Sequence, residues 1–161
     1  MPLSIRVAAK NDIQAIVNLF SITRGELAQL THEGCTGTIM EKQLFEDLLA
    51  EFKERLEDDS CLAYVAENEH GLAGFITAAV ESCSDELIGA PFLTIEFVET
   101  APTARGQGVA TALISVVEKW AVEHEIEFID LLVWDSNIPA AKLYEKLGYS
   151  TLERRMVKRV G

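Results

Sequence analysis

The feature of this sequence that most constrains its fold is Arg105-Gly-Gln-Gly-Val-Ala110, a turn of small residues that leads directly into an amphipathic helical pattern. The first amides of a helix lack partners within the helix and carry the positive end of its dipole, so together they can hold a phosphate. Gly106 and Gly108 let a ligand approach the backbone closely. Arg105 adds a planar set of donors suited to phosphate oxygens. The sequence therefore predicts an anion site at this turn.

Two common phosphate-binding patterns do not fit the turn. A Walker loop ends in Gly-Lys-Ser/Thr, which occurs nowhere in the chain. A dinucleotide fingerprint needs Gly or Ala where the chain has Thr111, although Glu127 and Asp130 lie near the expected acidic spacing. Only about 50 residues follow the turn, too few for the rest of a sheet of that kind. The turn therefore belongs late in its domain.

The same turn matches the pattern Arg/Gln-x-x-Gly-x-Gly/Ala through Arg105, Gly108 and Ala110. This pattern resembles the acyl-CoA pyrophosphate loop of the GNAT superfamily of N-acyltransferases. The resemblance implies that the cosubstrate is acetyl-CoA and that its diphosphate lies on this turn.

A second motif supports the resemblance independently. The stretch Asn137-Ile-Pro-Ala-Ala-Lys-Leu-Tyr-Glu-Lys-Leu-Gly-Tyr149 is similar to the family signature Asn-x-x-Ala-x-x-Leu-Tyr-Glu-Lys-x-Gly-Phe, with Tyr149 in place of the commoner Phe. The order and the spacing of the two motifs agree with the family. The specific resemblance runs from about Phe92 to Tyr149.

The resemblance implies an α/β fold: a mixed, mostly antiparallel central sheet of about six to seven strands flanked by about four helices, with splayed strands at the acyl-CoA site. The chain has 161 residues, of which 48% are hydrophobic, and this suits a single core. We therefore expect residues 1–161 to form one N-acetyltransferase domain.

The hydrophobic pattern predicts where the individual elements lie. Strands are expected at 4–8, 61–66, 72–80, 92–100, 128–134 and 149–158. Helices are expected after a cap at Asn11, from a capping box at residues 38–41, from the anion turn to about His124, and after a cap at Asn137. Residues 21–37 are expected to be loop-rich, and the strand at 128–134 to be central in the sheet.

The activity that the resemblance implies is transfer of an acyl group, usually acetyl, from CoA to an amine. Because an alkyl amine with a pKa near 10.4 is almost fully protonated at pH 7, a base should deprotonate it. By its offset from Arg105, Glu96 matches the position of the glutamate that many family members use, and Glu99 is the alternative. The two should face opposite ways along a strand unless a bulge intervenes. Either could instead be a solvated strand acid.

The resemblance assigns further roles along the same region. A backbone amide near Val98 would stabilise the thioester oxyanion, and the pantetheine arm would lie along a free strand edge. Tyr144 would protonate the departing thiolate, although a helical tyrosine can also simply fill space. Asn137 would bond the cofactor besides capping its helix. The expected cofactor-binding residues are Val98, Thr100, Arg105, Gly106, Gln107, Gly108, Val109, Ala110 and Asn137.

Composition limits the partners. A net charge of −12 disfavours nonspecific nucleic-acid binding, which depends on clustered cations. No apolar run approaches about 18 residues and the start lacks a secretion signal, so we expect a cytoplasmic protein with no membrane partner. Cys35, Cys61 and Cys83 are odd in number and widely spaced, which favours reduced thiols, and no metal-site spacing is present, so no metal is expected.

The acceptor is a primary amine of a small molecule or peptide that the sequence does not identify. The family implies that the first two helices, their connecting loop and the last strands shape its site, and that loop carries Arg24, Glu26, His32 and Glu33. Homodimers are frequent in the family. The alternative to an enzyme is a noncatalytic acyl-CoA-binding sensor that uses the same turn.

Overall fold

The computed structural model describes residues 2–30, 42–58, 60–81, 91–154, 156, 158 and 160. The expected capping box at 38–41, as well as Cys35 and Cys83, lies outside these residues. One five-stranded sheet runs in the order β1-β2-β3-β4-β5 through the described chain. Its strands are β1 (Ser4–Val7), β2 (Cys61–Asn68), β3 (Gly71–Glu81), β4 (Phe92–Thr100) and β5 (Phe128–Leu131). All neighbours are antiparallel except β4 and β5, which are parallel.

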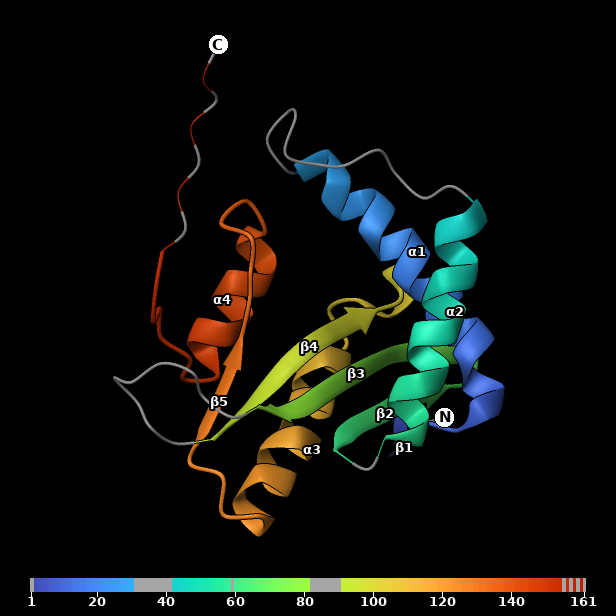
Figure 1. Cartoon of the computed structure of the whole chain (residues 1–161), viewed down its shortest axis with the longest axis horizontal. Helices are drawn as coiled ribbons and strands as arrows, with labels where there is room; N and C mark the ends of the chain where they lie inside the picture. Colours follow the sequence, from blue (N-terminus) through green and yellow to red (C-terminus); the bar gives the residue numbers. More distant parts are fainter. Residues whose placement is uncertain are drawn as a thin grey trace.

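Helices cover both faces of this sheet (Figure 1). The four α-helices are α1 (Ile13–Leu30), α2 (Lys42–Glu57), α3 (Val109–Glu123) and α4 (Ile138–Lys146). The core is divided accordingly into two clusters of buried residues. One joins α1 and α2 to the sheet through Ile16, Val17, Leu19, Phe20, Leu48, Phe52, Val65 and Phe75. The other joins α3 to the opposite face, with Leu143 and Tyr144 of α4 packed against it. The expected mixed α/β fold is confirmed.

The first helix differs from the sequence prediction at both ends. Asn11 is not a helix cap, because it lies inside a 3₁₀ turn at Lys10–Asp12, where Asp12 accepts a hydrogen bond from Ala9 N–H at 2.8 Å. The interval predicted as loop from residue 21 is helical as far as Leu30. Thr23 is buried and donates its hydroxyl back to the helix carbonyls of Leu19 and Phe20, so burial overrides the weak local propensity.

The end of the chain also differs from the prediction. The strand expected at 128–134 ends at Leu131 and lies at the sheet edge, with Leu132 93% exposed. The strand expected at 149–158 is not formed in its described residues, where Leu152 and Met156 are exposed. Figure 1 shows the red segment after α4 leading away from the sheet. The described sheet therefore has five strands, fewer than expected, and β5 is its edge strand.

Gly74 of β3 allows α3 to pack closely on the sheet. A Cβ at this position would lie 2.6 Å from the Glu99 carbonyl oxygen and 2.8 Å from Cγ1 of Val109. Val109 is the first residue of α3, so this contact fixes where the helix starts relative to the end of β4. The anion turn joins those two elements.

We expect Gly74→Ala to destabilise the protein by about 1–3 kcal/mol, because the added methyl group overlaps a backbone oxygen that cannot move freely. Urea unfolding followed by circular dichroism measures the effect. Gly25→Ala is the matched control: it lies inside α1 with open space at its Cβ, so it should stabilise the protein by up to about 1 kcal/mol. Equal effects of the two substitutions would contradict the packing described here.

Candidate active site

The anion turn has the conformation that its glycines predict. Gly106 and Gly108 have φ values of 73° and 80°, in the left-handed region, and a Cβ at either position would meet no atom within 4 Å. The glycines are therefore required by backbone conformation rather than by lack of space. Gln107 between them donates its side-chain amide to the carbonyl of Thr103 at 3.0 Å, which closes the turn on itself.

The start of α3 is open to a ligand. Gly108 is the N-cap, no side chain caps the helix, and the first turn carries no acid. The first backbone bond into the helix is from Ala112 N–H to Gly108 O at 2.9 Å, and residues 106–111 donate to no backbone carbonyl within the described chain. Val109 and Ala110 belong to this group. These amides and the helix dipole fit a phosphate.

Arg105 is not a free cation in this structure. Its guanidinium forms a close ion pair with Glu26 of α1, and both side chains are about half exposed. The pair links the anion turn to the end of α1. A phosphate at the turn would compete with Glu26 for the same donors.

β4 presents an open backbone edge next to the turn. β4 and β5 pair only over residues 92–95 and then diverge (Figure 1). Farther along β4, Ala101 N–H donates to Ala73 O of β3 at 2.9 Å. Because backbone groups alternate in direction along a strand, the amides of Val98 and Thr100 point to the other edge, which has no strand partner in the described chain. These are the two β4 residues predicted to bind the pantetheine arm.

A bulge at Glu96 decides where the two candidate bases point. Ile95 and Phe97 pair with consecutive residues of β3, so Glu96 has no partner of its own. Phe97 packs with the core under α1 and α2, and both Glu96 and Glu99 contact arginines of these helices. The two glutamates therefore face the same side of the sheet, which the sequence allowed only with a bulge.

Each glutamate has an arginine partner. Glu96 forms a close ion pair with Arg55 of α2, and its Oε2 atom is buried without a hydrogen-bond partner in the described structure. Oε1 of Glu99 lies 3.8 Å from a terminal nitrogen of Arg24 of α1. Phe97 lies close to both arginines, with the Arg24 and Arg55 guanidinium carbons 5.2 and 5.8 Å from its ring centre.

The charge of Glu99 acts on Tyr144. Burial raises the pKa of Glu99 above its usual value, while the Arg24 charge opposes that shift. Burial also raises the pKa of Tyr144 to about 12, and the charge of Glu99 contributes to this shift. Tyr144 therefore holds its proton at neutral pH and faces an environment that contains the Glu99 carboxylate.

The helix that carries Tyr144 starts as the sequence predicts. The side chain of Asn137 accepts a hydrogen bond from Ala140 N–H at 3.4 Å, and Pro139 occupies the first turn. Gly148 follows the helix with a φ of 97°. Tyr149 packs edge-on against Tyr144 with ring centres 6.0 Å apart, which orients the Tyr144 ring. The capping role of Asn137 is confirmed, and a contact of Asn137 with the cofactor stays a prediction.

Sequence reasoning assigned no role to Arg55 and placed Arg24 in a loop. Both arginines lie on helix faces that also bury a phenylalanine: Arg24 is four residues after Phe20, and Arg55 is three residues after Phe52. That spacing was the available signal, because residues three or four apart share a helix face. It does not reveal which strand residue the arginine meets.

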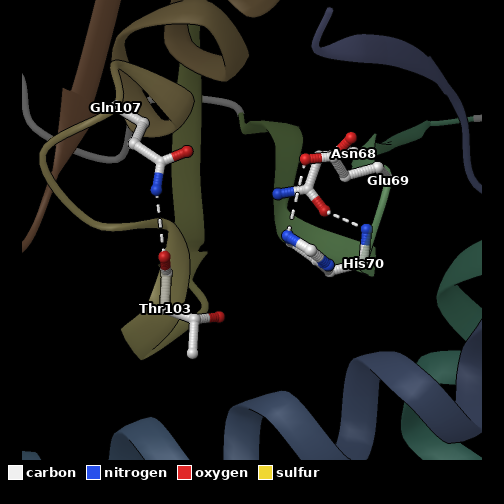
Figure 2. A pocket seen from close by; sticks show the side chains of 5 residues that line it. All are labelled: Asn68, Glu69, His70, Thr103 and Gln107. Atoms are coloured by element: carbon white, nitrogen blue, oxygen red, sulfur yellow. Dashed lines mark hydrogen bonds and ion pairs between the residues drawn. The ribbon is translucent and has the colours of Figure 1, made fainter. Parts of the chain in front are cut away.

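An open pocket of about 560 Å³ lies between the β2–β3 hairpin and the anion turn with the 3₁₀ turn before it. Figure 2 shows Asn68, Glu69 and His70 of the β2–β3 hairpin facing Thr103 and Gln107 across it. Neither the candidate bases nor Tyr144 lines this pocket. Within the described residues there is no group of three or more side chains that could hold a metal ion, and no helix is long and apolar enough to cross a membrane.

Comparison with known proteins agrees with this geometry. The profile of the Acetyltransferase (GNAT) family matches residues 26–149. The N-terminal acetyltransferase B complex catalytic subunit NAT3 of Saccharomyces cerevisiae is 36% identical over 88 residues, 53% of this chain and 43% of that protein. Streptothricin acetyltransferase of Escherichia coli is 39% identical over 57 residues, 35% of this chain and 33% of that protein. The matches thus span less than half the length of either relative.

Solved structures share the fold over the whole chain. A protein of Clostridium acetobutylicum, determined with acetyl-CoA, superposes with a TM-score of 0.71 over 98% of this chain and 96% of its own, at 21% identity. AAC(6')-Iy in complex with a bisubstrate analogue of CoA also has a TM-score of 0.71, over 100% of this chain and 99% of its own, at 21% identity. At these identities the likeness shows the fold alone.

The raised pKa of Glu99 predicts how its removal changes stability. The folded protein binds the Glu99 proton more tightly than the unfolded chain does, so ionisation of Glu99 opposes folding. We expect Glu99→Gln to stabilise the protein relative to wild type by an amount that grows as the pH rises above the usual glutamate value of 4.5. Denaturant unfolding at a series of pH values measures this difference.

Asp12→Asn is a control of opposite sign. A hydrogen bond from Arg6 lowers the pKa of Asp12, so its ionised form favours folding, and that contribution is lost as the pH falls through the folded-state pKa below 3.8. Asp12→Asn should therefore destabilise the protein at neutral pH and much less in acid. A Glu99→Gln difference that stays flat or shrinks with rising pH would contradict the burial of this carboxylate.

Proposed function

Because this chain belongs to the GNAT acetyltransferase family, we propose that it is an acetyl-CoA-dependent acyltransferase that transfers the acetyl group directly to a primary amine of a small molecule or peptide. The observation that carries the proposal is the open edge of β4, which runs from the anion turn toward the region of Glu99 and Tyr144. A ligand extended along this edge is held at one end by its phosphates and reaches titratable groups at the other.

The residues present fit acetyl-CoA. The unpaired amides of residues 106–111 bind the diphosphate, with Arg105 as an added cation once it exchanges Glu26 for a phosphate oxygen. The backbone of Val98 and Thr100 pairs with the amide-bearing arm in the manner of an added strand. When bound, acetyl-CoA supplies a thioester carbonyl that an amine can attack, and the Val98 amide is the donor for its oxygen.

The contacts favour Glu99 over Glu96 as the group that takes the amine proton. Glu96 was the base expected from its offset in the sequence, but its carboxylate is held in a close ion pair with Arg55. Glu99 has a looser partner, a pKa raised by burial, and the electrostatic connection to Tyr144. A base with a raised pKa is better matched to proton transfer near neutral pH. Tyr144 is then the acid that protonates the departing thiolate.

The relatives support an amine acceptor without identifying it. One carries the name of an N-terminal acetyltransferase subunit and the other that of a streptothricin acetyltransferase. These names describe one protein acceptor and one small-molecule acceptor. We propose an acceptor of the same broad class of amines for this chain.

We expect Tyr144→Phe to lower kcat by about 10²- to 10⁴-fold, because the thiolate loses its proton donor, with little change in acetyl-CoA affinity. Steady-state release of CoA with an amine acceptor measures kcat, and calorimetric titration measures affinity. Tyr64→Phe, a partly buried tyrosine of β2, is the matched control and should keep kcat within about threefold of wild type. An unchanged kcat in Tyr144→Phe would remove this residue from the mechanism.

The anion turn is tested by a pair of isosteric substitutions at the N-cap. Asp and Asn both tolerate the left-handed conformation of Gly108, but only Asp places a negative charge where the diphosphate binds. We expect Gly108→Asp to weaken CoA binding at least about 100-fold more than Gly108→Asn. Aspartate is also a favourable N-cap, so the Asp variant should not melt below the Asn variant. Equal CoA affinities in the two variants would contradict the placement of the diphosphate.

If wild-type protein binds acetyl-CoA but releases no CoA with any amine offered, it is a noncatalytic acyl-CoA-binding module instead. The acceptors offered should include small polyamines, amino acids, aminoglycosides and peptides with free amino termini. CoA release with any of them establishes turnover.

A further inference from the structure

Arg24 is a cation whose donors are mostly unused. Its guanidinium carbon lies 4.6 Å from the ring centre of Phe20 and 5.2 Å from that of Phe97. Among the described residues it forms one ion pair, with Glu99 at 3.8 Å, which is longer than a hydrogen bond. Its Nε atom is buried and has no hydrogen-bond partner within the described structure.

Arg55 provides the contrast within the same site. It donates from Nε and a terminal nitrogen to Glu51, the latter at 3.0 Å, and forms the close ion pair with Glu96. Both arginines are about equally accessible, with side chains 33% and 23% exposed. One guanidinium is therefore satisfied by the protein and the other is not. An unsatisfied buried donor is costly, which favours a ligand that supplies the missing acceptor.

Arg24 lies near the place proposed for the acceptor amine. Glu99 contacts Arg24 and also acts on Tyr144, so an amine at Glu99 has the Arg24 guanidinium a few ångströms away. Arg24 is held in place by two aromatic rings, which orient its planar fork of donors. A carboxylate fits this fork with two parallel hydrogen bonds.

The charged side chains around the site pair with one another, and among the described residues Arg55 pairs with both Glu51 and Glu96. Glu26 pairs with Arg105, Glu96 with Arg55, and Glu99 with Arg24. The Glu99–Arg24 pair is the most loosely joined of these, so it offers one anionic and one cationic group to a molecule that carries both charges.

The geometry points to an acceptor that carries a carboxylate next to its reactive amine, with Arg24 binding the carboxylate while the amine reaches Glu99 and Tyr144. This inference rests on the proposed function. The shared chemistry is an amine and a carboxylate a few bonds apart. It occurs in a free α-amino acid and in a peptide whose free amino terminus is followed by an acidic side chain.

The test compares acceptors that differ only in the carboxylate. A free α-amino acid, its carboxamide and the amine that lacks the carboxyl group are assayed by CoA release at saturating acetyl-CoA. A dipeptide amide with aspartate at its second position and its asparagine counterpart form the peptide pair. We expect kcat/KM to be about 10- to 100-fold higher for the carboxylate member of at least one pair, the range of a charged hydrogen-bonded pair. The pair that shows the preference identifies the source.

Arg24→Gln should erase that preference by raising KM for the carboxylate acceptor about 10- to 100-fold while leaving KM for the amide within about threefold. Arg24→Lys keeps the charge without the fork and should give an intermediate preference. Lys119→Gln removes one positive charge from the exposed surface of α3 and should leave all values unchanged. The Arg24 charge lowers the pKa of Glu99, so loss of this charge also changes how activity depends on pH. KM values are therefore compared at the pH optimum of each variant.

Three outcomes overturn the inference in distinguishable ways. If wild type acetylates carboxylate and amide acceptors equally, the acceptor assignment is wrong and the proposed function stands. If wild type binds CoA and turns over none of the amines, the proposed function itself fails and the inference fails with it. A pH shift in Arg24→Gln without a selective rise in KM would assign Arg24 to tuning Glu99 instead of binding substrate. Should Arg24→Gln not fold, the wild-type preference and Arg24→Lys still decide.

Discussion

The site depends on the separation of β4 from β5 after residue 95. Up to that point the two strands pair in parallel, and the Thr94 hydroxyl donates to Asp130 at 2.7 Å across them. The bulge at Glu96 then changes the direction and twist of β4, and its outer edge continues without a partner in the described chain. An unpaired strand edge inside a folded domain is normally a liability. Here the open edge leads to the uncapped start of α3. A ligand with amides at one end and phosphates at the other can therefore hydrogen-bond to both the strand edge and the helix start.

The same bulge also determines the electrostatics of the opposite side. It directs Glu96, Phe97 and Glu99 toward α1 and α2, where the Phe97 ring lies close to the arginines of both arginine–glutamate pairs. Partly exposed ion pairs of this kind contribute little to stability on average. Their value lies in fixing which charges face an incoming acceptor. Each glutamate has its own arginine partner, so the two carboxylates are not equivalent.

Local signals predicted the parts of the site that local interactions build. The positive φ of Gly106 and Gly108, the Asn137 cap and the bounds of β4 all follow from residues within a few positions of one another. The errors fall where a distant partner decides. The helix containing Thr23 continues where Thr23 is buried in the fold, and the described residues after Tyr149 form no strand. Local residue spacing also could not predict the ion pairs that Arg24 and Arg55 form with β4, because these pairs join helices to a strand far along the chain.

The coupling between Glu99 and Tyr144 gives the proposed reaction an order. While Glu99 is ionised, its charge adds to burial in holding the Tyr144 proton, which keeps the tyrosine neutral before the acceptor reacts. Once Glu99 takes the amine proton it becomes neutral, and that contribution disappears. The pKa of Tyr144 then falls, so the phenol becomes a better acid at the moment when the thiolate departs and needs a proton. In the proposed reaction, protonation of Glu99 and the acidity of Tyr144 are in this way linked.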